Sequence, residues 1–139
     1  MRLHKTGGGI AMNEANSRIL RKLGNDEAFY FYTDIGNYTG QNASSLEEFL
    51  SRIQEIDTKS LEFHLLREDF EKWMSSTIGD AQLAEDIKLL RVQKVAGSSL
   101  RNHLSLIVSK RLKELKSASN VLEGKKQTKR KKSVVTSEN

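Results

Sequence analysis

His64 and Glu68 lie four residues apart, the spacing at which two side chains on one turn of a helix can ligate the same metal ion. Asp69 and His103 supply further oxygen and nitrogen donors. A metal site needs three or four converging ligands, yet the chain has three histidines and no His-Glu-x-x-His motif. We therefore expect a partly exposed His64, no metal and no cofactor.

Several carboxylates in the same segment belong to the residue type that general acid and base catalysis requires. They are Glu62, Glu68, Asp69 and Glu71. Because Arg67 and Lys72 lie among them, we interpret the segment as a solvated helix face with local ion pairs. The sequence has no cysteine, and the glycines at 7–9 precede no Lys-Ser pair of a phosphate-binding loop. These observations predict a protein that is not an enzyme.

Charge is sorted along the chain. Residues 1–24 carry a net charge of +4, residues 25–90 carry −9, and residues 91–139 carry +10, within a total of +5. A concentrated positive segment attracts polyanions, while an acidic body keeps the rest of the surface away from them. The distribution therefore favours nucleic acid as a partner at the C-terminal end and a protein partner on the acidic body.

The cationic block Lys125–Lys132 holds six Lys or Arg residues. Six phosphate contacts give a slope of about −5 for log affinity against log salt concentration, which is enough for electrostatic binding without sequence readout. The candidate nucleic-acid-binding residues are Arg101, Lys110, Arg111, Lys113, Lys116, Lys125, Lys126, Lys129, Arg130, Lys131 and Lys132. No aromatic residue lies among the lysines, so we expect no base stacking by the tail. The alternative is a tail that only aids solubility or acts as a localisation signal.

An aromatic run at residues 29–33 predicts a short buried strand, and the Gly- and Asn-rich residues 34–42 predict a loop. The aromatic residues, together with Tyr38, His64 and Trp73, could instead line a pocket for a base or a sugar ring. A small domain needs its large side chains for stability, so we favour core packing, with Tyr38 as the exposed ring.

Capping residues and apolar periodicity predict four helices after this loop. Ser45 and Glu48 form a capping box at the start of the first helix. The second begins at Thr58 or Ser60, bends near Glu68 and ends at Gly79. Its expected apolar stripe is Phe63, Leu66, Phe70, Trp73, Met74 and Thr77.

Asp80 caps the third helix, and Ser98 or Ser99 caps the fourth, which is amphipathic and basic. The third helix turns Leu83, Ala84, Ile87 and Leu90 inward, and the fourth does the same with Leu100, Leu104, Ile107, Val108, Leu112 and Leu115.

The predicted fold class is mainly α: a small four-helix domain with a short N-terminal aromatic strand. We place a flexible basic arm at residues 1–24, the helical domain at 25–117 and a disordered basic tail at 118–139. Met12 would also serve as a start. Because no apolar run reaches the ~18 residues of a membrane helix, we expect no membrane contact and a cytoplasmic location.

Five sequence blocks in a fixed order resemble a small domain family of unknown function found mainly in archaea and also in bacteria. The blocks begin at Phe29, Ser45, Ser60, Asp69 and Gly79, and the resemblance covers roughly residues 27–92. It implies a compact, mostly helical unit without an established activity. The basic helix and the tail lie outside the shared blocks and look like an addition.

The sequence thus favours a non-enzymatic accessory protein that contacts nucleic acid or ribonucleoprotein through its basic C-terminal helix and tail. The alternative is a regulatory module whose helical body binds a protein or a small ligand while the tail is incidental.

Overall fold

The computed structural model describes the backbone of residues 7–124 and the side chains of residues 14–117. This part of the chain is mainly helical with one antiparallel two-stranded sheet, which confirms the predicted class. The elements are α1 (Gly7–Leu20), β1 (Phe29–Asp34), β2 (Asn37–Ala43), α2 (Leu46–Ile53), α3 (Thr58–Leu66), α4 (Asp69–Lys72), the π-helix η1 (Trp73–Ile78), α5 (Ala81–Val92) and α6 (Gly97–Gly124).

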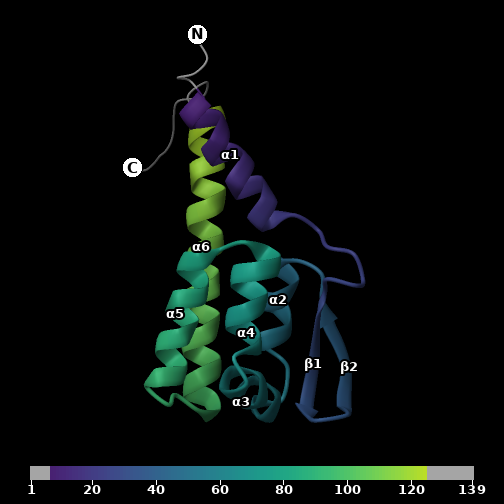
Figure 1. The fold of residues 1–139 in the computed structure, drawn as a ribbon. Helices are drawn as coiled ribbons and strands as arrows, with labels where there is room; N and C mark the ends of the chain where they lie inside the picture. The colour runs from purple at the N-terminus through teal and green to yellow at the C-terminus, as the bar shows by residue number, and fades with distance from the viewer. Residues whose placement is uncertain (1–6, 125–139) are drawn as a thin grey trace, which may run out of the picture.

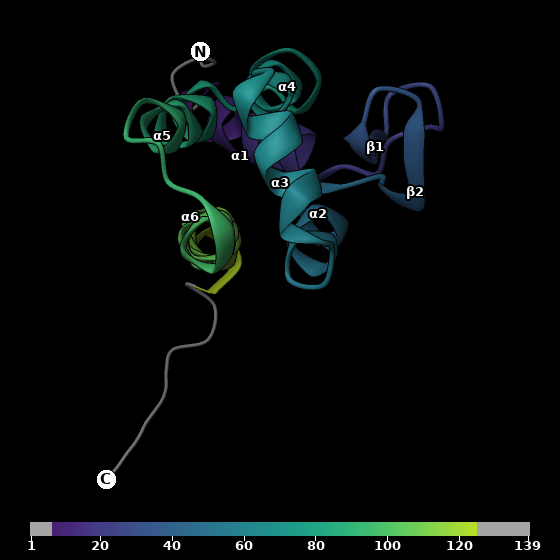
Figure 2. The ribbon, with the colours of Figure 1, turned by 90° about the horizontal axis from the view of Figure 1, so that it is seen from below.

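These elements lie in three layers (Figures 1 and 2). The hairpin β1–β2 forms one side, α2, α3 and α4 form the middle, and α5 and α6 form the other side. Helix α1 packs against the part of α6 that extends beyond the middle layer. The hairpin therefore meets α2 and α3, whereas α6 contacts α2 and α3 from the opposite side.

Phe29 is the centre of the core. Its ring centroid lies between 4.8 and 5.9 Å from the rings of Phe31, Phe49, His64, Phe70 and Trp73. Side chains alternate between the two faces of a strand, so Phe29 and Phe31 point toward the helices while Tyr30 and Tyr32 point away from the core. The structure confirms core packing for Phe29, Phe31 and Trp73, and it leaves Tyr38 43% exposed as predicted.

The predicted loop at residues 34–42 is wrong, because Asn37–Ala43 forms β2 and pairs with β1. Asp34 pairs with Asn37 around a turn at Ile35 and Gly36, and Gly36 has a φ of +78° that suits glycine. Most of β2 is exposed, so its polar residues face solvent. Pairing with β1 outweighs their weak intrinsic strand propensity.

The predicted caps of α2 and α5 are confirmed. Ser45 Oγ accepts a hydrogen bond from the Glu48 amide at 3.1 Å, and Asp80 Oδ1 accepts one from the Leu83 amide at 3.1 Å. Glu48 reaches back to the amide of Ser44 at 2.8 Å, one residue beyond the expected position. The cap of α3 is Asp57, which accepts from the Lys59 amide at 2.9 Å, and not Thr58 or Ser60.

The expected bend near Glu68 is a complete break between α3 and α4. Glu68 has a φ of +67°, in the left-handed region, and α4 then passes directly into η1, which ends at Gly79. The expected apolar stripe assumed one continuous helix. The break changes which residues face the core on either side of Glu68. Leu66 is accordingly 68% exposed, contrary to expectation, and Leu61 and Leu65 are buried in its place.

The helical part of the chain extends beyond the expected boundaries of the domain, residues 25 and 117, at both ends. Residues 7–20 form α1, and Ile19 and Leu23 are buried in the core, where a flexible arm was expected. Residues 118–124 continue α6, where a disordered tail was expected. Residues 1–6 and 125–139 lie outside the described part.

The inward faces of α5 and α6 agree with prediction. Leu83, Ala84, Ile87, Leu90, Leu100, Leu104, Val108, Leu112 and Leu115 are buried, and Ile107 is partly buried against them. Among residues 7–124, no helix is both long enough and apolar enough to cross a bilayer.

The left-handed backbone at Glu68 predicts that Glu68→Gly stabilises the protein. The left-handed conformation destabilises a non-glycine residue by about 1–2 kcal/mol, and glycine removes this strain. Glycine also increases the entropy of the unfolded chain, which offsets part of the gain, so we expect a net increase of about 1 kcal/mol in the free energy of unfolding. Urea denaturation measures it. The matched control is Glu85→Gly, at an exposed position inside α5, which should lose about 1 kcal/mol. Destabilisation by both substitutions would contradict the assigned strain.

Candidate functional site

Three of the five basic candidates on α6 are engaged within the fold. Arg101 donates to the backbone carbonyl of Ile56, and Lys116 pairs with Glu47. Arg111 Nε donates to Asp80 Oδ2 at 2.6 Å, and Asp80 is only 2% exposed. These contacts join α6 to α2, to the turn that follows α2 and to the start of α5, so each of the three side chains already has a partner, although Lys116 and Glu47 pair on the surface.

Arg111 and Asp80 form the most buried of the ion pairs in the described chain. Burial disfavours the charged guanidinium, but the hydrogen bond and the negative charge of Asp80 outweigh burial and raise the pKa of Arg111. Since Asp80 also caps α5, a single carboxylate holds both the N-terminus of α5 and the middle of α6.

Lys110 and Lys113 are the two remaining α6 candidates, and both are exposed. No described acidic side chain lies within ion-pair distance of either lysine. The six tail candidates, Lys125, Lys126, Lys129, Arg130, Lys131 and Lys132, lie outside the described residues. The cationic block begins at the residue that follows Gly124, the last residue of α6.

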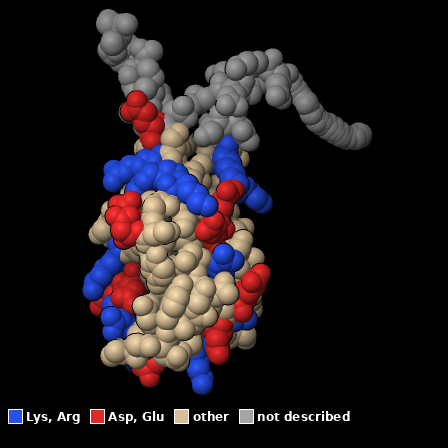
Figure 3. Space-filling model, turned by 90° about the vertical axis from the view of Figure 1, so that its right-hand side faces the viewer, with Lys and Arg blue, Asp and Glu red and all other residues tan. Residues whose placement is uncertain are grey.

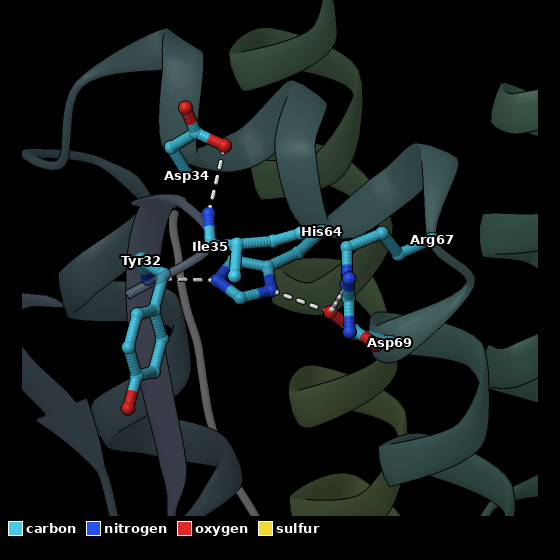
Figure 4. A network of polar contacts seen from close by, with 6 residues as sticks. All are labelled: Tyr32, Asp34, Ile35, His64, Arg67 and Asp69. Atoms are coloured by element: carbon cyan, nitrogen blue, oxygen red, sulfur yellow. Dashed lines mark hydrogen bonds and ion pairs between the residues drawn. The ribbon is translucent and has the colours of Figure 1, made fainter. Parts of the chain in front are cut away.

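His64 connects the hairpin to the helices (Figure 4). Its Nε2 accepts a hydrogen bond from the backbone N–H of Tyr32 at 2.8 Å, and its Nδ1 lies 2.8 Å from Asp69 Oδ2. A backbone amide can only donate, so Nε2 carries no proton and Nδ1–H donates to Asp69. Arg67 Nε donates to the same Asp69 oxygen at 3.1 Å.

The network keeps His64 neutral. The side chain is buried, contrary to the predicted partial exposure, and this burial lowers the pKa of His64 below its ordinary value of 6.5. The hydrogen bond and charge of Asp69 act in the opposite direction, and Arg67 assists the lowering. Both ring nitrogens are occupied inside the fold, so neither is free to abstract a proton or to ligate a metal.

The residues considered for a metal site do not converge. Asp69 is hydrogen-bonded to His64, whereas the carboxylate of Glu68 lies 4.0 Å from Arg91. His103 is exposed on α6, where its Nδ1 lies 2.8 Å from the carbonyl oxygen of Ser99. Within the residues whose side chains are described, no group of three His, Asp or Glu side chains could hold a metal ion.

A groove of about 570 Å³ opens beside His64, between β1 and the segment α3–α4–η1. Its aromatic lining includes Tyr30, Tyr32, Phe63 and Trp73, and its cations are Arg67 and Lys72. The size is that of a ligand pocket. Two features of the sequence pointed toward this groove: the alternation of Phe and Tyr at residues 29–32 and the bend near Glu68. That β1 lies beside the bend depends on the tertiary fold.

The fold and this site define a small helical domain with a tyrosine-bearing hairpin, in which the described side chains form no group that could hold a metal ion. The family model of DUF5752, a family of unknown function, matches residues 26–136, and the chain belongs to this family. The match includes α6 and most of the tail, so the expectation that both lie outside the shared part is wrong. Among curated proteins and among solved structures, none matches the chain.

The pairing of Arg111 with Asp80 predicts that Arg111→Met lowers the free energy of unfolding by about 3 kcal/mol, because a buried carboxylate loses its partner. Lys113→Met, on the same helix, should change it by less than about 0.5 kcal/mol. Adding Asp80→Asn to Arg111→Met should restore part of the loss, since asparagine still caps α5. Chemical denaturation measures all three, and equal effects at Arg111 and Lys113 would contradict a structural role for Arg111.

The lowered pKa of His64 predicts that stability falls as the pH drops below 6.5. Below that pH, His64 is protonated in the unfolded chain but stays neutral in the native protein. The free energy of unfolding therefore falls by up to about 1.4 kcal/mol per pH unit from this group, until the pKa of His64 in the native protein is reached. Urea denaturation between neutral and mildly acidic pH measures the slope. It should shrink in His64→Gln and persist in His103→Gln; an unchanged slope in His64→Gln would refute the assignment.

Proposed function

We propose that the protein is a non-enzymatic accessory protein that contacts nucleic acid, or a ribonucleoprotein, through exposed lysines of α6 and the cationic block that follows this helix. The observation that carries this proposal is the exposure of Lys110 and Lys113 on a helix that leads directly into Lys125–Lys132. Arg101, Arg111 and Lys116 are left out of the contact surface because each already pairs with another group of the described chain.

The shape of the molecule supports this assignment. Helix α6 has 28 residues, which corresponds to about 42 Å, and its C-terminal part extends beyond the middle layer beside α1 (Figure 1). Gly124, the last residue before the cationic block, therefore lies away from the middle layer. The family match to residue 136 also supports a shared role for this end of the chain.

The acidic body would contact a second partner, which we propose to be a protein. Six exposed carboxylates between residues 25 and 90 have no described basic side chain within ion-pair distance. They are Asp26, Glu27, Asp34, Glu55, Asp57 and Glu85. Carboxylates repel phosphate, so these six side chains would face the protein partner and not the nucleic acid.

A second candidate function follows from the groove beside His64. A cavity of about 570 Å³ lined by Phe29, Tyr30, Tyr32, Phe63 and Trp73 would also suit a regulatory module that binds a ligand or a protein segment while the tail is incidental. The salt dependence of nucleic-acid binding separates the two candidates.

The proposal predicts a steep salt dependence of duplex DNA binding. Two helix lysines and six tail residues, if all contact phosphates, give a slope of log affinity against log salt of about −7. Replacing the six tail cations by Gln in the full chain should reduce its magnitude by about 5, and Lys110→Gln with Lys113→Gln by about 2. Fluorescence anisotropy of a labelled duplex measures these slopes.

The matched control is Lys59→Gln with Lys88→Gln, which removes two exposed lysines from α3 and α5. This double variant should keep the slope of the unmodified chain. Unchanged duplex affinity after neutralisation of the tail would overturn the proposal and favour the second candidate.

A further inference from the structure

The groove beside His64 presents aromatic faces on two sides. Tyr30 and Tyr32 project from β1 on the face away from the core, and both are partly exposed. Phe63, also partly exposed, lies across the groove on α3, and Trp73 lies deeper, with its Nε1–H donating to the carbonyl of Glu27 at 2.8 Å. Flat rings on opposing walls can stack on a planar group placed between them.

Cations follow the same groove. Arg67 lies above the Phe63 ring, 5.1 Å from its centroid, and its side chain is 51% exposed. Lys72 is exposed, and no described carboxylate lies within ion-pair distance of it. At the far end, Arg21 donates to the carbonyl of Thr77, a residue of the groove, at 2.8 Å.

The groove lining also has two acidic residues. Asp69 is already shared between His64 and Arg67, and Asp34 stands at the hairpin turn, where it accepts from the Ile35 amide. The two cations and two carboxylates of the lining balance, so the groove is neutral within a body segment, residues 25–90, that carries −9. Figure 3 shows the hairpin side of the molecule: its middle is largely uncharged, and basic residues gather across its upper part.

Stacking faces beside a line of cations match the chemistry of unpaired nucleotides, whose bases stack on aromatic rings while their phosphates meet the cations. A duplex hides its base faces and offers only the phosphates. A proline-rich peptide also docks on aromatic grooves, but it gives Arg67 and Lys72 no anionic partner. The combination therefore favours a single strand over either alternative.

We infer that the groove between β1 and α3–α4–η1 binds the bases of single-stranded nucleic acid, with Tyr32 as a stacking face and Arg67 and Lys72 as phosphate contacts. This inference rests on the proposed function and gives it a preference for unpaired strands. The tail supplies non-specific affinity, and the groove distinguishes single strands from duplexes.

The only tryptophan of the chain, Trp73, lines the groove, so its fluorescence reports occupancy directly. We expect oligothymidylate to change this fluorescence, whereas a duplex of equal length and inorganic polyphosphate bind without changing it. Tyr32→Ala should weaken oligothymidylate binding about tenfold, because one stacked base contributes about 1–3 kcal/mol. Tyr32→Phe, which keeps the ring, should bind as the unmodified chain does.

Lys72→Gln is the second test, because this exposed side chain can change without disturbing the fold. It should weaken oligothymidylate binding and lower the magnitude of the salt slope by about 0.7, the value for one phosphate contact on a single strand. Lys59→Gln is its control. Equal binding of oligothymidylate by Tyr32→Ala, Tyr32→Phe and Lys72→Gln would overturn the inference, as would a proline-rich peptide that changes Trp73 fluorescence where oligothymidylate does not.

The full chain with its six tail cations replaced by Gln separates this inference from the proposed function. If the groove binds single strands, this variant keeps the Trp73 response and the preference over duplex, at lower overall affinity. If only the tail binds, the variant loses single-strand and duplex affinity together, and the inference is wrong while the proposed function stands. Binding of both nucleic acids that is independent of the tail would refute the proposed function alone.

Discussion

The hydrogen bonds of one buried histidine hold the hairpin to the helices. His64 on α3 receives the Tyr32 amide of β1 at one ring nitrogen and donates to Asp69 of α4 at the other. The same ring packs on Phe29, the centre of the aromatic core. Glu68 breaks the helix between His64 and Asp69, and this break lets Asp69 turn back toward His64. The width of the groove beside β1 is thus set by a polar contact inside an apolar core.

Charge in this protein has two separate roles. Arg101, Arg111 and Lys116 neutralise or cap groups of other helices, so part of the basic composition of α6 belongs to the fold. Lys110, Lys113 and the block after Gly124 form the part that we assign to phosphate. The same division applies to the acidic body, where Asp80 is buried against Arg111 while Asp26 and Glu85 face solvent. Counting charges along the sequence overstates both binding surfaces.

Local signals in the sequence predicted the caps Ser45 and Asp80 and the buried faces of α5 and α6, because a cap or an apolar stripe depends on neighbours within one helix. They missed β2, whose polar residues pair only because β1 is present. They also missed the burial of His64 and the pairing of Arg111, since both partners lie far away in the sequence or beyond the break at Glu68. The sequence offered the aromatic residues 29–33, His64 and Trp73 as a pocket lining, but core packing was favoured, because the groove depends on β1 lying beside α3–α4–η1 and no local pattern specifies that contact.

The central claim is that neutral His64, protonated at Nδ1, fastens the hairpin through the Tyr32 amide. Nitrogen NMR of the imidazole, combined with hydrogen exchange of the Tyr32 amide, measures it directly. The account predicts the Nδ1–H tautomer at neutral pH, a protected Tyr32 amide, and loss of that protection in His64→Leu. A protonated Nε2, or a Tyr32 amide that exchanges as fast as those of the exposed turn at Ile35 and Gly36, would contradict it.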